Sequence, residues 1–433
     1  MSNPRELALK SLIKWSEDGS FSNLEINTVI SRSNMEAQDS ALYTLLYLGV
    51  IENAIYLDYV IAQYSSLPLS KIDQDAKNIL RLSLYQLLFC DKIPEYSVVN
   101  EGVNLARKRS KGFVNGLLRS FIRAGKSVKL PKDEKKRFLL ENSVPEELYE
   151  LFVDSFGKDV AREILSYKNE DKSLSLRVNT LKATRGEIIK CLTSQGYKPE
   201  ASSIACDIIK CNCPISKIEG LISDGKLFVQ DESSRIASQL VEAREEMRVI
   251  DLCACPGGKS FSMAIDMKSR GSLVSSDLHK NKLSLIEKGA ARLGIDIITT
   301  KEQDARELVK EYENSFDRVL CDVPCSGLGV IFKKPDIKYK SLKEIEKLPE
   351  IQLGILRAGA KYVKVGGYLV YSTCTLNKKE NQDNIEKFLL ENKSFKPVEF
   401  SIDGINSQGG VYTFLPHVNQ TDGFFVAKMV RVE

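Results

Sequence analysis

The sequence has little of what several common kinds of active site require. It holds only two histidines, His279 and His417, among 433 residues. Zinc sites built on imidazole and Ser-His-Asp catalysis therefore have little material to work with. No apolar run reaches the roughly 18 residues that a membrane-spanning helix needs, and the N-terminal stretch MSNPRELALK lacks the apolar core of a signal peptide. We therefore expect a cytoplasmic protein that does not associate with a membrane.

Cysteine, in contrast, is plentiful. Ten cysteines in so long a chain, several of them on predicted core strands, are typical of reduced thiols rather than of a disulfide framework. Cys211 and Cys213 stand close together with Cys206 nearby, but their spacing fits no zinc pattern and no histidine is near. We therefore predict no metal site.

The first 140 residues show helical periodicity and hardly any strand signal. Asn3-Pro4 is a typical helix cap followed by proline at the first helical position. Between residues 113 and 122 apolar side chains repeat with the spacing of one buried helical face, and Arg119 and Arg123 fall on the opposite side. These patterns predict an all-α bundle over residues 1–140.

Positive charge is concentrated at the end of this helical segment. Residues 105–137 hold twelve Lys or Arg and only two acids, Asp133 and Glu134, although the whole chain has a net charge of +4. Such a local excess is the electrostatic footprint expected for a polyanion such as RNA. The alternative is a solvated helix face followed by a basic linker over residues 126–136.

The rest of the chain divides into two further predicted domains. Residues 141–235 mix short helices with two strand patterns, which indicates a small α+β module. From about residue 227 strands and helices alternate, which predicts a doubly wound, mostly parallel α/β sheet covered on both faces over residues 236–433. The expected strands are MRVIDL, GSLVSSDL, IDIITT, FDRVLCDV and GGYLVYST, with FKPVEF and DGFFVAKMVRV closing the sheet in antiparallel orientation.

Two of these strands end at a cysteine. The run YLVYSTCTL (residues 368–376) and the run leading into DVPCSG (residues 322–327) are apolar and stop abruptly at small polar residues. Sites in open α/β sheets lie at the carboxyl ends of strands. We therefore expect Cys325 and Cys374 to face one crevice, with the carboxylate of Asp322 beside them. A single cysteine at a strand end is more often a small buried residue, but two in these contexts favour chemistry.

A glycine-rich turn precedes them. VIDLCACPGGKS (residues 249–260) is a strand, a turn with Gly257 and Gly258, and then a helix, so a ligand can approach backbone amides closely. It is neither a mononucleotide phosphate loop nor a G-x-G-x-x-G dinucleotide loop. Asp277 ends the next strand, where nucleoside-binding α/β folds place a carboxylate on ribose hydroxyls, and Asp304 ends the third. Each acid alone could equally be a helix cap or a turn residue.

Taken with DVPCSGLGV (residues 322–330), FKKPDIKY (residues 332–339) and YSTCTLNKKEN (residues 371–381), this turn makes the chain resemble the RsmB/Sun (Fmu) branch of the NOP-Sun RNA cytosine-5 methyltransferases. The segment SVVNEGVNLARKRSKGFVNGLLRSFIR (residues 97–123), in the N-terminal helical part of the chain, resembles the NusB-type RNA-binding domain. This resemblance indicates the branch of the family that acts on bacterial 16S ribosomal RNA. The resemblance covers essentially the whole chain. Cys255 departs from the family's usual alanine, but both residues are small.

The resemblance implies that S-adenosylmethionine is the cofactor, that no metal takes part, and that 16S ribosomal RNA is the partner of a monomeric enzyme. Cys374 matches the nucleophile that attacks carbon 6 of cytosine, Cys325 the residue that promotes release, and Asp322 the acid that contacts the ring edge. The residues implied for cofactor binding are Ala254, Cys255, Pro256, Gly257, Gly258, Lys259 and Ser260 at the methionine portion, Asp277 at the ribose, Asp304 near the adenine, and Asp322.

Three alternatives stay open at this stage. The same chemistry could act on transfer RNA, although the helical domain argues against that. The chain could also be an RNA-binding ribosome-assembly factor without activity, although the intact cysteines, Asp322 and the glycine-rich turn argue against it. Finally, the segment KKPDIKY is interpreted either as an RNA-contacting loop or as an exposed basic turn.

Overall fold

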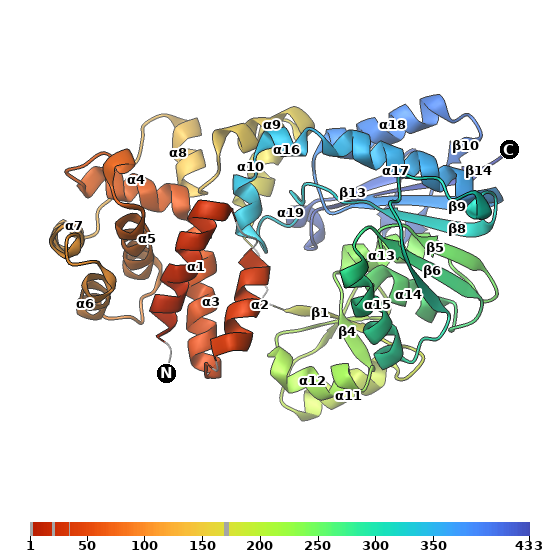
Figure 1. Cartoon of the computed structure of the whole chain (residues 1–433), viewed down its shortest axis with the longest axis horizontal. Coiled ribbons are helices and arrows are strands. Elements are labelled where there is room, and N and C mark those ends of the chain that lie inside the picture. Colours follow the sequence, from red (N-terminus) through yellow and green to blue (C-terminus); the bar gives the residue numbers. More distant parts are fainter. Residues whose placement is uncertain (1–2, 20–21, 34, 169–172) are drawn as a thin grey trace. The chain divides into compact units, whose positions relative to one another are not determined.

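The structure is a computed structural model that describes residues 3–19, 22–33, 35–168 and 173–433 (Figure 1). Met1 and Ser2, part of the N-terminal stretch considered above, lie outside these ranges. The contacts between residues divide the chain into two compact units. Unit 1 comprises Met1–Ser166 and Ile331–Ser341, and unit 2 comprises Tyr167–Val330 and Leu342–Glu433. The three-domain division at residues 140 and 235 stays a prediction from the sequence.

Unit 1 is helical, as its periodicity predicts. Its helices are α1 (Pro4–Asp18), α2 (Ser22–Ser33), α3 (Ala37–Glu52), α4 (Ala54–Tyr64), η1 (Leu69–Lys71), α5 (Gln74–Phe89), α6 (Glu95–Leu105), α7 (Lys111–Arg123), α8 (Glu134–Glu141), α9 (Glu146–Phe156) and α10 (Lys158–Ser166). Asn3 caps α1 by accepting a hydrogen bond from the backbone N–H of Arg5, and Pro4 occupies the first turn. Helix α5 is buried along most of its length and packs against α1, α3, α4, α6 and α7, so it is the centre of the bundle.

The predicted basic linker is only partly a linker. Helix α8 begins at Glu134 because the Asp133 side chain accepts a hydrogen bond from the backbone N–H of Lys136 and so caps it. The last residues of the basic run, Lys135 and Lys136, are therefore helical.

A segment from the second half of the chain belongs to unit 1. Within Ile331–Ser341, helix η3 (Pro335–Tyr339) packs on α3. The Lys338 ammonium donates to the carbonyl of Glu52 at 2.8 Å, and the Tyr339 hydroxyl donates to the carbonyl of Ile51 at 2.9 Å. The Tyr339 ring meets Trp15 edge to face, with ring centres 5.3 Å apart.

Both interpretations of KKPDIKY are therefore wrong for residues 335–338. The side chains of Asp336 and Lys338 are 9% and 8% exposed, and Asp336 accepts a hydrogen bond from the Ser22 hydroxyl. Only Lys333 and Lys334 of the segment are exposed. Charged side chains so deeply buried need partners, and the helical unit supplies them.

A small sheet opens unit 2. Its strands are β1 (Leu174–Val178), β2 (Glu200–Ala201), β3 (Ile208–Cys211) and β4 (Leu227–Val229), arranged in the order β2-β3-β1-β4 with antiparallel neighbours. Helices α11 (Arg185–Ser194) and α12 (Ile215–Ser223) contribute to its apolar core. The predicted α+β module is thus present, and Cys211 and Cys213 are buried in that core.

The large sheet is mixed and mostly parallel, as predicted. Its order is β10-β14-β9-β8-β5-β6-β7, with β13 paired to β14. The strands are β5 (Arg248–Asp251), β6 (Ser272–Asp277), β7 (Ile298–Glu302), β8 (Phe316–Asp322), β9 (Val363–Thr373), β10 (Phe395–Pro397), β13 (Val411–Phe414) and β14 (Phe424–Arg431). Strands β5 to β9 pair in parallel, whereas β14 is antiparallel to β9, β10 and β13. A short pair, β11 (Ser401–Ile402) and β12 (Ile405–Asn406), stands apart.

Two helical layers cover this sheet (Figure 1). Successive strand residues alternate between two apolar cores: Val249, Leu320 and Val370 belong to one, and Ile250, Val319 and Leu369 to the other. The first core is completed by α13 (Glu232–Leu240), α14 (Gly258–Asp266) and α15 (Lys280–Leu293), and the second by α17 (Leu348–Tyr362) and α18 (Gln382–Glu391). The shorter elements of this unit are η2 (Lys310–Tyr312), α16 (Leu342–Ile345), η4 (Lys378–Glu380) and α19 (Pro416–Asn419).

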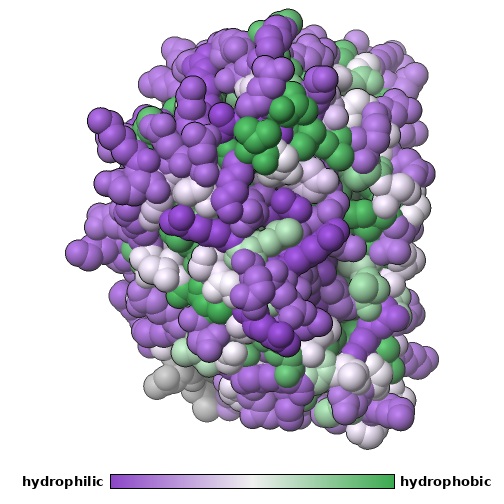
Figure 2. Space-filling view, turned by 90° about the vertical axis from the view of Figure 1, so that its right-hand side faces the viewer, coloured by the Kyte–Doolittle hydropathy of each residue, from purple (hydrophilic) through white to green (hydrophobic). Residues whose placement is uncertain are grey.

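The molecular face shown in Figure 2 is mostly hydrophilic, with hydrophobic residues in small separate groups. Within the described ranges no single helix is long and apolar enough to cross a membrane. Helices α3 and α4 reach that length and composition only together, and they are bent by 76° at the break between them.

Candidate active site

The two cysteines at strand ends lie together. Strands β8 and β9 pair in parallel with Asp322 opposite Ser372, so the loops after them start at the same level of the sheet. The sulfur atoms of Cys325 and Cys374 are 3.3 Å apart, and both residues are half-buried. The two thiols therefore lie together as predicted, although neither cysteine is among the residues that line the cavity described below.

The surroundings of Cys325 hold it in the protonated form. The hydrogen bond with Cys374 and burial raise the pKa of the Cys325 thiol well above its usual value, and the Glu380 carboxylate adds to the effect. Either sulfur can donate the hydrogen bond between them. When the Cys325 thiol donates, Cys374 accepts, and an accepted hydrogen bond favours the thiolate form.

Close backbone contacts fix the two cysteine loops to each other. The backbone N–H of Gly329 donates to the carbonyl of Cys374 at 3.0 Å, and the hydroxyls of Ser326 and Thr375 are 2.6 Å apart. A Cβ atom on Gly329 would lie 1.8 Å from the carbonyl oxygen of Gly423, so only glycine fits there.

Glu380 holds the same loops in place through hydrogen bonds. Its carboxylate is fully buried and accepts hydrogen bonds from the Ser326 backbone N–H at 2.9 Å, the Gln352 amide at 2.8 Å and the Asn377 amide at 3.0 Å. Sequence reasoning missed this residue, because a glutamate in the charged run KKEN gives no sign of burial.

Asp322, the last residue of β8, forms an ion pair with Lys259 of α14. One of its oxygens accepts from the Lys259 ammonium at 2.7 Å, and the other accepts from the Ser372 hydroxyl at 2.7 Å. Burial disfavours the charged form of Lys259, but the Asp322 carboxylate outweighs it and raises the pKa of Lys259. The Lys259 side chain is 13% exposed, so this ammonium stays charged in a largely dehydrated position.

The glycine-rich turn joins β5 to α14. Gly257 adopts a left-handed conformation with φ of +110°, and a Cβ atom there would lie 2.5 Å from the Phe261 ring. Behind the turn, the buried carboxylate of Asp251 accepts from the Ser260 hydroxyl at 2.7 Å, while its second oxygen has no hydrogen-bond partner. Burial raises the pKa of Asp251 to about 7, although the Ser260 hydrogen bond opposes the rise.

A cavity of about 230 Å³ lies between this turn and Asp322. Its walls are Val229, Gln230, Asp231, Ser234, Ala254, Cys255, Pro256, Gly258, Lys259 and Asp322. Four of these, residues 229–231 and Ser234, were missed from the sequence. The signal that could have found them is QDESS (residues 230–234), in which Asp231 caps the helix that precedes the first strand of the large sheet.

Asp277 and Asp304 are not among the residues that line this cavity. Asp277 accepts from the backbone N–H groups of Cys255 at 3.2 Å and His279 at 3.0 Å, so it braces the glycine-rich turn. Asp304 accepts from the Arg306 guanidinium at 2.9 Å, and that hydrogen bond lowers the pKa of Asp304. Ser260 lies inside the protein, bonded to Asp251.

Three family models match the chain. The 16S rRNA methyltransferase RsmB/F model matches residues 238–430, the NusB family model matches residues 2–123, and the ferredoxin-like domain model of RsmF/B-like methyltransferases matches residues 144–216. The four-stranded sheet β2-β3-β1-β4 and its two helices fall mainly in the third match and just beyond it.

Relatives and solved structures agree with these models. The chain is 38% identical to the probable ribosomal RNA small subunit methyltransferase B of Bacillus subtilis (strain 168), with 98% of each chain covered. It is similar to the crystal structure of PH0851, with 26% identity and a TM-score of 0.83 over 100% of this chain and 99% of that one. It is also similar to NSun6 from Pyrococcus horikoshii with SFG, with 25% identity and a TM-score of 0.60 over 67% of this chain and 98% of the other.

Proposed function

The chain belongs to the ribosomal RNA small subunit methyltransferase B family, and from that membership we propose that it transfers the methyl group of S-adenosylmethionine to carbon 5 of a cytosine in 16S ribosomal RNA. The observation that carries this chemistry is the pair of sulfurs of Cys325 and Cys374, 3.3 Å apart. Carbon 5 of cytosine is a poor nucleophile, and a sulfur added at carbon 6 makes it enamine-like. Two thiols at one site suit a reaction that must first form a carbon–sulfur bond and later break it.

Cys374 is the nucleophile in this proposal. Only a thiolate attacks efficiently, and in this proposal the Cys325 thiol, whose pKa is raised, donates its hydrogen bond to the Cys374 sulfur. The Lys259 ammonium is close enough for Cys374 to influence its pKa, so a positive charge also favours the thiolate. Attack forms a bond from the Cys374 sulfur to carbon 6 and moves negative charge onto the opposite edge of the ring.

The ion pair of Asp322 and Lys259 faces that charge. It lines the cavity, where it is shielded from water on most sides. The Asp322 carboxylate accepts a hydrogen bond from the amino group beside ring nitrogen 3, and the Lys259 ammonium supplies the positive charge that offsets the negative charge on the ring. Fixed polar groups that face a developing charge are effective because they need no rearrangement during the reaction.

Cys325 then promotes release. After carbon 5 has taken the methyl group, the Cys325 sulfur, having lost its own proton to solvent, accepts the proton of carbon 5. The carbon 6–sulfur bond breaks, the aromatic ring reforms, and Cys374 leaves as a thiolate. One proton is released in the net reaction, which balances the loss of the positive charge of the methyl donor.

The glycine-rich turn fits a nucleoside-bearing cofactor. Ala254, Cys255, Pro256, Gly258 and Lys259 line the cavity, Gly258 has no side chain to obstruct it, and the buried Asp251 oxygen behind the turn lacks a partner. S-adenosylmethionine, when bound, supplies an electrophilic methyl group. By the family pattern, residues 254–260 hold its methionine portion, Asp277 its ribose and Asp304 its adenine region.

The test is methyl transfer in vitro. Protein, labelled S-adenosylmethionine and undermethylated 16S ribosomal RNA should yield 5-methylcytosine. Cys374→Ala should lower transfer at least about a thousandfold, because the covalent step is lost. Cys325→Ala should accumulate a covalent protein–RNA adduct, visible as a slowly migrating band on a denaturing gel. Cys206→Ala, which removes an exposed thiol elsewhere, is the matched control and should behave like the wild type.

Unchanged transfer by Cys374→Ala would overturn the assignment of the nucleophile. Label on transfer RNA instead of 16S ribosomal RNA would retain the chemistry but change the substrate. No label on any RNA from a folded wild-type protein would favour an assembly factor without activity.

A further inference from the structure

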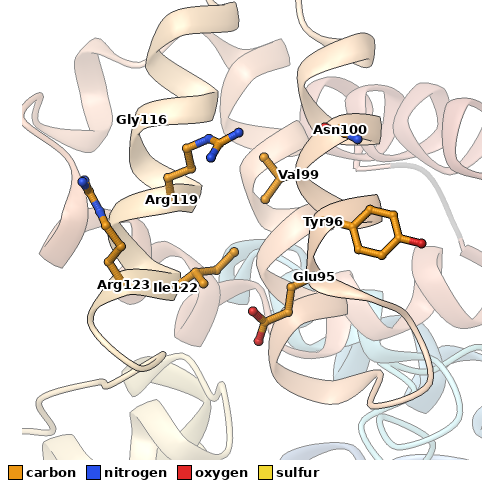
Figure 3. A pocket seen from close by; sticks show the side chains of 8 residues that line it. All are labelled: Glu95, Tyr96, Val99, Asn100, Gly116, Arg119, Ile122 and Arg123. Atoms are coloured by element: carbon orange, nitrogen blue, oxygen red, sulfur yellow. The ribbon is translucent and has the colours of Figure 1, made fainter.

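A groove between α6 and α7 of unit 1 stands apart from the cysteine site. Two adjoining cavities of about 430 and 650 Å³ share Asn100 and Arg119 and together form one groove along these helices. In Figure 3 Val99 of α6 and Ile122 of α7 flank its floor, and Arg119 extends from α7 toward α6. Tyr96 stands at the α6 edge, and the residue is 73% exposed.

The groove exists because α7 presents glycines on this side. Gly112 and Gly116 lie four residues apart on one helical face, and a Cβ atom on either would meet nothing within 4 Å. Glycine lowers helix stability relative to alanine, and neither residue has a positive φ that would require it. What the two glycines provide is open space beside Arg119.

The charge that lines the groove is positive and uncompensated. Lys111, Arg119 and Arg123 line it, and no carboxylate of the described residues forms an ion pair with any of them. Its one acid, Glu95, already pairs with Lys126 at 3.0 Å. The Arg119 Nε donates to Asn115 at 2.9 Å, which orients the guanidinium and leaves its terminal nitrogens available.

Elsewhere in the basic stretch many cations are neutralised. Arg107 pairs with Asp75, Arg109 with Asp73, and Arg137 with Glu141. Lys108, Lys129, Lys132 and Lys136 also lack a carboxylate partner among the described residues, but they do not line the groove. The groove therefore combines uncompensated cations with an apolar floor and an exposed aromatic ring.

We propose that this groove binds an unpaired segment of RNA. Backbone phosphates contact Lys111, Arg119 and Arg123, a base stacks on Tyr96 or packs on the Val99–Ile122 floor, and the amides of Asn100, Asn104 and Asn115 bond base edges. Cationic grooves with aromatic platforms are typical of single-strand binding. A duplex hides its base faces and would use only the cations. The inference rests on the proposed function for the identity of the RNA, and it adds the surface that holds it.

The test uses the full chain and a short fluorescein-labelled single-stranded oligoribonucleotide, followed by anisotropy over a range of salt concentrations. Arg119→Glu should weaken binding about tenfold or more and lower the slope of log K against log salt by about 0.7 for each phosphate that the variant no longer binds. Gly116→Glu, which fills the groove with negative charge, should weaken binding by a similar factor, and Gly116→Gln should do so less. Arg137→Glu, at an exposed arginine outside the groove, is the matched control and should change binding less than threefold.

Methyl transfer to 16S ribosomal RNA separates this inference from the proposed function. Arg119→Glu should raise the KM for RNA and leave kcat unchanged. Suppose that the wild type binds RNA and transfers no methyl group, while Arg119→Glu fails to bind RNA. That result would support the groove as an RNA-binding site and contradict the proposed function.

Three results would overturn the groove assignment. The first is an equal affinity for the single-stranded RNA in Arg119→Glu, Gly116→Glu and the control Arg137→Glu, provided that circular dichroism shows all three variants to be folded. The second is equal competition by a duplex of the same length. The third is a loss of self-association in sedimentation with unchanged RNA binding, which would assign the groove to a second copy of the chain.

Discussion

At the scale of single residues, the site depends on charges and protons held in unusual states. Cys325 is kept protonated by its neighbour and by burial, and Lys259 is kept charged by Asp322. The two thiols thereby become unequal although both end neighbouring strands. Unequal thiols suit the different roles proposed for them, because one must attack as a thiolate and the other must hold a proton until later.

Asp251 couples stability to pH. Burial raises its pKa to about 7 in the folded protein, whereas a carboxyl of the unfolded chain titrates near about 3.9. Between these values the folded state binds a proton that the unfolded state does not. The stabilisation is therefore fully present below about pH 4 and is lost as the pH rises through about 7.

Replacing Asp251 by asparagine should remove that dependence. From about pH 5.5 to about pH 8 the free energy of unfolding of Asp251→Asn should rise relative to the wild type by about 2 kcal/mol, because the wild type must ionise a buried group. Urea unfolding of both proteins at the two pH values measures the difference. Asp154→Asn, at an exposed carboxyl, is the control; an Asp251→Asn difference that does not change with pH would contradict the assignment.

At the scale of elements, the loops after β8 and β9 work as one piece. The backbone of Gly329 forms hydrogen bonds with both Cys374 and Gly423. The buried Glu380 carboxylate accepts a hydrogen bond from the backbone N–H of Ser326. These contacts set the sulfur–sulfur distance, because Cys325 lies three residues beyond the end of β8 and the strand pairing alone does not fix its position.

Gly329→Ala should therefore separate the loops. Its Cβ atom would lie 1.8 Å from the Gly423 carbonyl oxygen, so one loop must move. Methyl transfer should fall about a hundredfold or more, the cost that a displacement of about 1 Å at reacting atoms can have. Gly220→Ala in α12, where a Cβ atom meets nothing within 4 Å, should retain wild-type transfer. Equal rates for the two variants would show that the loop contact is not needed.

The sequence predicted these elements well and their side-chain partners less well. Strand–helix alternation and the cysteines at strand ends placed the two thiols together, because parallel strands bring their carboxyl ends to one edge. The strand expected at residues 295–300 instead runs from Ile298 to Glu302, because Gly294 ends α15 in a left-handed conformation and the backbone N–H of Ile295 still donates to the helix carbonyl of Ala290. Local patterns fix the kind of element more firmly than its ends.

At the scale of the whole molecule, sequence order and compact units do not coincide. The chain leaves unit 2 after Val330, five residues past Cys325, and returns to it at Leu342. Between these points η3 contributes Tyr339 and Lys338 to the helical unit, bonded to residues more than 280 positions earlier. No sequence pattern predicts such a contact, because the segment is as charged as an exposed turn. A truncated helical unit would lack this part of its core, so its RNA binding is best measured on the full chain.

The proposed reaction requires that Cys374 form a bond to cytosine, and one measurement tests that bond most directly. RNA carrying 5-fluorocytosine has no removable proton at carbon 5, so the covalent complex should persist once the methyl group has been transferred. Protease digestion and mass spectrometry of the complex should place the modified nucleotide on Cys374, and Cys374→Ala should form no complex. An adduct on Cys325, or methylation without any adduct at Cys374, would contradict the account.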